Sequence, residues 1–412
     1  MDRRVVITGI GMVTPNGIGR QAHWEAALRG QSGIGRPLRL THPDLPVRVV
    51  GEVKDFVPTD HMTKKLVVRT DRNAHFAFAG TGEALKDAGL DLAQEDSSRA
   101  GIVLAANYGG VNYVLDNLVR LHQKGPSFVS AYMAIAWIPS APAGQLSIFY
   151  GLSGYTKTVV NDTAGGVDAI GEAYRVIRSD EADLLIAGGY EAALTEASLA
   201  AFATYGDICR DAPDPTAAYR PFDHRPSGMV IGEGGATVIL EELSRAQARG
   251  ASIYAEIVGY AQTADAVALQ DFAADGVQYG RAMRRALEMS GRGGRDVDFF
   301  SADGRATERA DRAEANALRY VFGERSADLP VTAPKSLIGN TMAGAGAIDV
   351  ATVALALRGG LIPPMVNIEC QDPEVGLRLV VGAPHATSLH CALIGARGTS
   401  GVNAALALAL LS

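Results

Sequence analysis

Short apolar runs alternate along the chain with stretches of helical periodicity. Residues 5–8, 102–106 and 184–187 are rich in β-branched and aliphatic side chains, which predicts buried strands. Residues 72–89 and 111–121 carry apolar positions three and four residues apart, which predicts helices with one buried face. Strands and helices in alternation indicate an α/β fold.

One stretch, residues 159–174, joins a strand to a helix through a tight turn of small residues. Val167, Ile170 and Tyr174 then share one helical face. Such a turn presents the side chain of Thr163 at the N-terminus of the helix, where backbone N–H groups favour negative charge. Thr163 is therefore the candidate for a presented, functional side chain.

The second half of the sequence resembles the first. Residues 255–260 repeat the pattern of the opening strand, and the small residues at 345–350 repeat those at 164–169. With 412 residues and 47% hydrophobic content, the chain is long enough for two fused halves. We predict a first half over residues 1–250, which includes interface loops, and a second half over residues 251–412.

Composition narrows the function classes. A net charge of −7 argues against a nucleic-acid partner. The three cysteines have no CxxC spacing, which predicts reduced thiols and neither a disulfide framework nor a metal site. No apolar run reaches membrane-spanning length and the first residues lack a signal-peptide core, so we expect a cytoplasmic protein with no membrane span. Thr14 and Pro15 break the pattern that a dinucleotide-binding glycine loop needs.

Three short strings carry a family resemblance. The elbow at Thr163, the string SADGRAT at residues 301–307 and the string KSLIGN at residues 335–340 resemble three motifs of the ketosynthases. These are condensing enzymes of the thiolase superfamily, and the corresponding motifs are the nucleophile elbow, xAHGTxT and KSxxGH. The resemblance runs from Val5 to about Leu408. It implies the thiolase fold, in which two βαβαβαββ halves form a five-layer αβαβα sandwich.

The residues that perform the chemistry in ketosynthases are replaced in this chain. Thr163 stands where the family has cysteine, and Asp303 and Asn340 stand where it has two histidines. Decarboxylative condensation needs a thiolate nucleophile and imidazole groups that stabilise an enolate. We therefore expect no catalytic residue here and no condensation by the chain alone. Arg397 and Thr399 replace two phenylalanines of the closing motif, the second of which is a gate in the family.

The scaffold around these positions is kept. Asp311 and Glu314 stand one helical turn apart, and Lys335 opens the string KSLIGN. In ketosynthases this spacing pairs a carboxylate with the lysine. The resemblance thus implies a buried, structural ion network made of these three residues.

A complete ketosynthase scaffold without its triad resembles the chain length factor, the β subunit of type II polyketide ketosynthases. The resemblance implies a heterodimer with an active ketosynthase, in which this chain shapes the tunnel for the growing acyl chain. It also implies an acyl carrier protein whose phosphopantetheine serves the complex, and no cofactor or metal held by this subunit. Chain length factors of aromatic pathways usually carry glutamine at the position of Thr163, so the product class stays open.

By the same resemblance, the tunnel is gated from the helix at 111–121. Val111, Val114 and Leu118 follow i, i+3, i+7 spacing on one face. Met133 lies on an apolar loop, residues 129–139, that is expected at the partner interface together with the elbow strand. Two valines and a leucine predict a wholly apolar lining, which favours a reduced or polyene product over an aromatic poly-β-ketone.

Two other functions compete with this interpretation. One is an enzyme, either a priming malonyl decarboxylase or an unusual threonine-dependent acyltransferase, which would acylate Thr163. The other is a purely structural ketosynthase-like scaffold without a tunnel, in which the helix at 111–121 would be ordinary core.

Overall fold

The computed structural model describes residues 3–205, 207–268 and 271–411 of the chain. Its main feature is a twelve-stranded mixed sheet. The first half contributes β1 (Val5–Thr14), β3 (Ala100–Ala105), β4 (Thr156–Val159), β5 (Leu184–Glu191) and β6 (Gly234–Glu242). The second half contributes β7 (Ala255–Ala264), β8 (Phe299–Ser301), β9 (Pro330–Thr332), β13 (Cys391–Arg397) and β14 (Val402–Ala409).

The two halves have the same strand topology. In space, the first half runs β4-β3-β5-β6-β1 and the second runs β9-β8-β13-β14-β7. Numbered within each half, both orders are third, second, fourth, fifth, first. The pairings also match, since β3 and β8 pair in parallel with both neighbours, while the last two pairings in each half are antiparallel. Antiparallel pairs between β1 and β7 join the halves.

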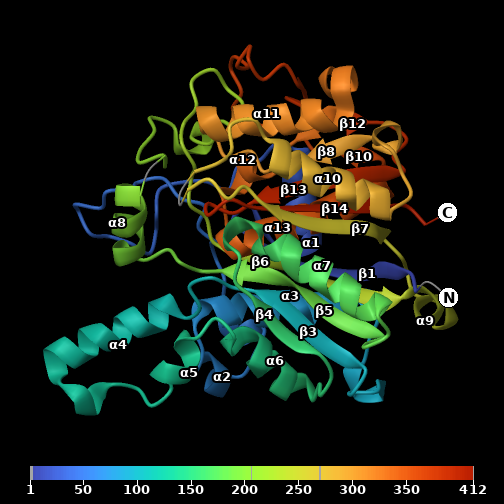
Figure 1. Ribbon diagram of the computed structural model, residues 1–412. Helices are drawn as coiled ribbons and strands as arrows, with labels where there is room; N and C mark the ends of the chain where they lie inside the picture. The colour runs from blue at the N-terminus through green and yellow to red at the C-terminus, as the bar shows by residue number, and fades with distance from the viewer. Residues whose placement is uncertain (1–2, 206, 269–270, 412) are drawn as a thin grey trace.

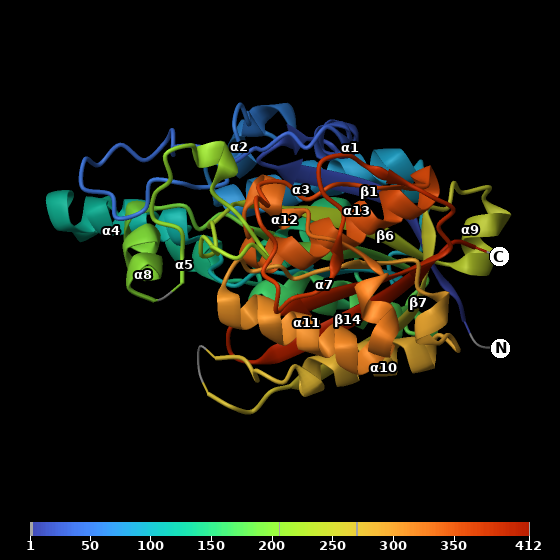
Figure 2. The same cartoon turned by 90° about the horizontal axis from the view of Figure 1, so that it is seen from above.

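Helices separate and cover the two halves in five layers (Figures 1 and 2). α7 (Gly165–Arg178) and α13 (Ala345–Gly359) lie between the halves, α3 (Arg72–Ala88) packs on β1 and β6, and α10 (Val277–Met289) packs on β7 and β14. α11 (Glu308–Phe322) packs beside α10. These layers confirm the predicted α/β fold.

Small residues let α7 and α13 cross closely. A Cβ atom on Gly166 would lie 2.4 Å from the backbone nitrogen of Ala347, and one on Gly346 would lie 2.7 Å from that of Val167. Both glycines belong to the two small-residue stretches that repeat in the sequence. The repeat therefore marks the contact between the halves, where a larger side chain would push the helices apart.

Nine further elements have ten residues or fewer. They are β2 (Gly17–Ile18), β10 (Leu361–Ile362), β11 (Arg378–Leu379), β12 (His385–Ala386), α1 (Arg20–Leu28), α2 (Lys64–Val67), α8 (Glu196–Tyr205), α9 (Leu243–Ala248) and α12 (Lys335–Ile338). One described stretch, Met342–Gly359, is apolar and long enough to cross a membrane. It ends in α13 and is 89% buried inside the protein, as a core helix would be.

One side of the first half projects from the body. α4 (Val111–Lys124), α5 (Met133–Trp137) and α6 (Ala141–Tyr150) lie there, in the lower part of Figure 1, and β4 is the last strand of the sheet. The sequence predicted an extended loop around Met133, but Met133 begins α5 instead, since the N–H of Ala136 donates to the carbonyl of Tyr132 at 2.8 Å. Large apolar side chains are exposed on this side. We call them the apolar edge surface: Ile135, Trp137, Ile138, Ile148, Phe149 and Val160.

Candidate functional site

The elbow forms as the sequence predicts. β4 ends at Val159, a single 3₁₀ turn, η4 (Asp162–Ala164), follows, and α7 begins at Gly165. Asp162 adopts a φ of 52°, a left-handed conformation that aspartate tolerates better than most residues. Thr163 is 1% exposed and lies directly before the helix.

The hydroxyl of Thr163 is fully engaged. It donates to the backbone carbonyl of Arg397 and accepts a hydrogen bond from Nη2 of Arg305. A threonine nucleophile needs a base that removes its proton. A carbonyl and a guanidinium are not bases, so this environment does not activate the hydroxyl.

A buried ion cluster fills the space beside Thr163. Nε of Arg305 donates to Oδ2 of Asp303 at 2.9 Å, and Nε of Arg397 lies 3.5 Å from the same oxygen. Both guanidinium carbons lie 4.8 Å from the centre of the Phe272 ring. Burial alone would raise the pKa of Asp303, but the positive charges of the two arginines outweigh burial and lower it. The carboxylate is therefore ionised and paired.

Asn340 completes the set of replaced positions. It is fully buried, and its Oδ1 accepts from the N–H of Met342 at 2.9 Å. Its Nδ2 has no hydrogen-bond partner among the described residues. Met342 starts the turn η8 (Met342–Gly344), which packs against η4. The structure thus brings Thr163, Asp303 and Asn340 to one place between the halves.

The predicted ion network is arranged differently from the sequence-based expectation. Lys335 pairs with Asp349 of α13, not with Asp311 or Glu314. Asp311 accepts backbone N–H groups from Phe222 at 2.7 Å and from Arg305 at 3.1 Å. Lys335 instead lies on α12, against α13. The expected pairing of the lysine with a carboxylate of α11 is therefore wrong.

The two carboxylates of α11 hold the loop that follows β8. Oε1 and Oε2 of Glu314 accept the N–H groups of Asp303 at 2.8 Å and Gly304 at 2.9 Å. Burial raises the pKa of Asp311 to about 8. Together, Asp311 and Glu314 fix the backbone from which the side chains of Asp303 and Arg305 reach the elbow.

A cavity of about 730 Å³ opens beside the elbow. Val111 and Leu115 of α4 line one side, and Phe202 of α8 lines another. Polar residues also line it, so this cavity is not wholly apolar. They are Asn107, Asn161, Asp162, Ser198, Thr399 and Ser400.

A second cavity of about 740 Å³ lies along the same helix. Leu115 lines both cavities, and Leu118 lines the second. Val114 is 7% exposed and lines neither cavity, and neither does Met133. The predicted face of α4 is therefore partly reassigned, because Leu115 and not Val114 lies between Val111 and Leu118 along the cavities.

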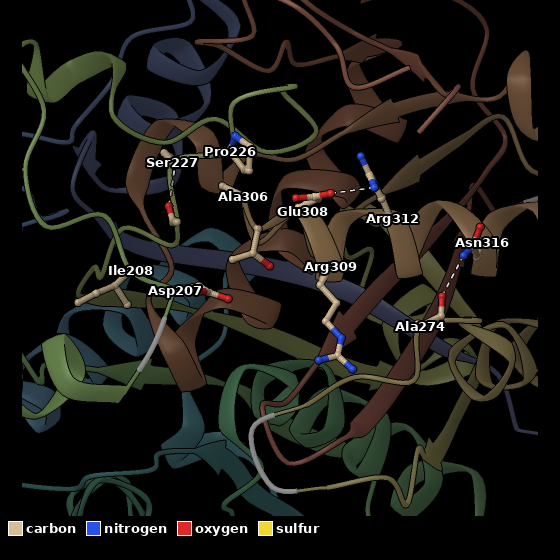
Figure 3. Close-up of a pocket in the computed structure, with 12 residues that line it drawn as sticks. Asp207, Ile208, Pro226, Ser227, Ala274, Ala306, Glu308, Arg309, Arg312 and Asn316 are labelled. Carbon is tan, nitrogen blue, oxygen red and sulfur yellow. Dashed lines mark hydrogen bonds and ion pairs between the residues drawn. The ribbon is translucent and has the colours of Figure 1, made fainter. Parts of the chain in front are cut away.

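A third cavity of about 790 Å³ is lined in part by Ala306 and Thr307, in the loop between β8 and α11 (Figure 3). Glu308 and Arg312, one turn apart on α11, pair in its wall at 2.8 Å, and Asn316 donates to the carbonyl of Ala274 at 2.9 Å. Ser227 is also engaged, because its hydroxyl donates to a backbone carbonyl. Across the described part of the chain, no group of three or more His, Cys, Asp or Glu side chains could hold a metal ion.

Three residues at or near the site were not predicted from the sequence. Arg305 could have been, because it stands at the position of the first threonine of the xAHGTxT motif. Asp349 and Glu191 had no signal, because their burial depends on tertiary packing. Glu191 ends β5, is fully buried and accepts the N–H of Asn107 at 2.9 Å. Burial raises the pKa of Glu191 to about 8.

Comparison with known proteins identifies the family. The β-ketoacyl synthase N-terminal domain matches residues 2–246, and the C-terminal domain matches residues 254–369. The chain is 39% identical to the tetracenomycin polyketide synthase ketoacyl synthase beta subunit of Streptomyces glaucescens, over 98% of this chain and 97% of that one. It is 36% identical to 3-oxoacyl-acyl-carrier-protein synthase 2 of Synechocystis sp., with the same coverage.

Solved structures of the same type superpose over the whole chain. The ishigamide ketosynthase/chain length factor has a TM-score of 0.93 at 28% identity, with 100% of both chains covered. A type II polyketide synthase acyl carrier protein in complex with its ketosynthase gives 0.92 at 28%, again with full coverage of both chains. The thiolase-like fold and the resemblance read from the motifs are confirmed. The chain belongs to the β-ketoacyl synthase family and is related there to the ketosynthase β subunits, the chain length factors, of type II polyketide synthases.

Proposed function

We propose that this chain is the non-catalytic, chain-length-determining subunit of a type II polyketide synthase. It pairs with an active ketosynthase in the cytoplasm and shapes the tunnel in which the acyl chain grows. The partner's cysteine carries that chain, and an acyl carrier protein delivers extender units on its phosphopantetheine. This chain itself holds no cofactor.

The ion cluster at the elbow carries the proposal. Condensation needs a thiolate, and enolate stabilisation needs neutral or cationic donors. Here Arg305 and Arg397 are paired with Asp303, and Arg305 donates to the Thr163 hydroxyl. The ionised Asp303 would repel an enolate, and no imidazole stands at the position of Asn340.

The exposed edge of the sheet supports the proposal that this chain binds a partner subunit. Among the described strands β4 pairs only with β3, so within the described part of the chain its other side has unpaired backbone groups. Beside it, the apolar edge surface includes Ile148 at 84% exposure and Phe149 at 50%. An apolar surface next to an open strand suits an obligate interface, which typically buries ~2,000 Å² or more. One of the solved structures that superpose on this chain is the ishigamide ketosynthase/chain length factor, which combines these two kinds of subunit.

The apolar lining that α4 gives the cavities supports one product class. Val111, Leu115 and Leu118 present hydrocarbon along α4. A ketone buried there without a partner would cost roughly 1–3 kcal/mol. We therefore favour a reduced or polyene chain over an aromatic poly-β-ketone, with the polar groups near the elbow accepting the oxygen substituents that remain.

Reconstitution tests the proposal. The full chain is mixed with its cognate ketosynthase, acyl carrier protein and malonyl-loaded carrier, and products are measured by mass spectrometry. We expect chains of defined length only when both subunits are present. Consumption of malonyl-carrier protein by this chain alone, or an acyl group on Thr163, would overturn it.

A further inference from the structure

Arg305 connects segments that are far apart in the sequence. Its Nη2 donates to Oγ1 of Thr163 on the elbow, and its Nη1 donates to Oγ1 of Thr399 at 3.2 Å. Nη2 also donates to the carbonyl of Arg397, at the end of β13. Arg305 is 4% exposed, and a planar guanidinium fixes the directions of its donors. One side chain therefore sets the spacing between the elbow and the loop after β13.

These two segments form one wall of the cavity beside the elbow. The elbow contributes Asn161 and Asp162, and the loop after β13 contributes Thr399 and Ser400. The N–H of Thr399 also donates to the carboxylate of Asp162. Val111 lines the same cavity from α4. A shift of the loop relative to the elbow would therefore change the width of the cavity.

The elbow conformation depends on such contacts. Asp162 has a φ of 52°, a left-handed conformation that a non-glycine residue keeps only where the surrounding structure holds it. The Arg305 guanidinium is itself fixed by Asp303 and by the Phe272 ring. The cluster thus gives the guanidinium a rigid base from which it holds the elbow and the loop.

We propose that Arg305 is a positioning residue that fixes one wall of the acyl tunnel, so that the ion cluster in the silent site helps to set product length. This inference rests on the proposed function. It assigns a role to the cluster beyond the loss of catalysis, since it makes the former nucleophile site a structural part of the length-determining machinery.

The test uses two variants and a matched control in the full chain paired with its ketosynthase. The double variant Asp303→Asn with Arg305→Gln removes the guanidinium and its counter-charge together, and Arg397 keeps a buried partner because its Nη2 lies 3.7 Å from Oε2 of Glu314. Thr399→Val removes only one of the acceptors through which Arg305 tethers the elbow and the loop after β13, namely Oγ1 of Thr399. Arg309→Gln is the control, because Arg309 lies four residues further on and pairs with Asp271 outside this wall.

The readouts are the product-length distribution and the rate of malonyl consumption. We expect the share of the dominant chain length to fall by about twofold or more in the double variant and less in Thr399→Val, because a loosened wall selects length poorly. The rate should change less than the distribution, and Arg309→Gln should match the wild type. A merely structural role would lower the melting temperature without widening the distribution.

Two results separate this inference from the proposed function. If Val111→Phe shifts product length while both tether variants assemble and keep the wild-type distribution, Arg305 has no positioning role. If the wild-type pair itself forms no chains of defined length, the proposed function fails. Should the double variant not fold, Thr399→Val decides, because it changes no buried charge.

Discussion

Thr163 stands at the elbow position that holds the cysteine nucleophile in ketosynthases. Its hydroxyl lies between the Arg397 carbonyl and the Arg305 guanidinium, and Asp303 is held ionised by both arginines. The three replaced positions could be found from the spacing of the motifs. The cluster that fills the site could not, because it depends on arginines that approach from two different segments of the fold.

Restoring the sulfur should not restore condensation. A cysteine in Thr163→Cys would lie beside the Arg305 guanidinium, which favours a thiolate. No imidazole would stabilise the enolate, however, and the loss of one such donor costs about 10²–10³ in rate. We expect no product from malonyl-carrier protein and this variant alone, measured by mass spectrometry with Thr163→Ser as the control. Product above the Thr163→Ser background would contradict this.

Glu191 predicts a dependence of stability on pH. Its pKa is raised from 4.5 to about 8, so the folded state holds a proton that the unfolded state releases above about pH 4.5. The contribution of the protonated Glu191 to the free energy of unfolding is complete below pH 4.5. It is lost as the pH rises towards 8, by at most ~1.4 kcal/mol per pH unit. Asp311 acts in the same direction.

Glu191→Gln should remove the contribution of Glu191 to the pH dependence of stability. Urea unfolding at about pH 5, 6.5 and 8 should show the wild type losing stability relative to this variant as the pH rises. The reason is that glutamine mimics the protonated acid and does not titrate. Parallel curves for the two proteins would show that Glu191 is ionised in the folded state.

At the scale of elements, α4 shows what a periodic pattern can and cannot predict. The helix begins at Val111, as the pattern predicts, and Val111 and Leu118 line cavities. Val114 does not, while Leu115 lines both cavities. Spacing on one helix cannot decide which of its side chains line a cavity. The neighbours that complete each cavity, such as α8, come from distant parts of the chain.

Bulky side chains on the cavity face of α4 should shorten the product. A phenylalanine in Val111→Phe or Leu115→Phe fills space along the path of the chain, so growth should stop at least one two-carbon unit earlier, with early extensions little affected. Leu121→Phe is the matched control, because Leu121 lies on the same helix and lines neither cavity. Equal product lengths in all three variants would place the tunnel elsewhere.

At the scale of the molecule, the duplicated halves place two small-residue elbows against each other. The shared strand order and the crossing of α7 and α13 follow from features visible in the sequence, namely repeated strand patterns and repeated glycines. The exposed side of β4 and the helices beside it could be predicted only in outline. Their exposure shows a surface that a partner would cover.

A charge on this surface should prevent assembly with the ketosynthase. Ile148 is 84% exposed beside the edge strand, and Ile148→Asp would bury a charge in the interface, at a cost of several kcal/mol. Val381→Asp is the control, at an exposed position of the second half. Sedimentation of the mixed subunits should show a heterodimer for the control and separate species for Ile148→Asp. A heterodimer with Ile148→Asp would move the interface away from this surface.

The most direct test of a silent, tunnel-shaping subunit is the intact mass of both subunits, measured after the working pair is quenched during turnover. Acyl groups should appear on the ketosynthase alone, because Thr163 lacks a base and its site is filled by the ion cluster. The mass of this chain should remain that of the unmodified protein throughout. An acyl or malonyl adduct on this chain that disappears in Thr163→Ala would contradict the account.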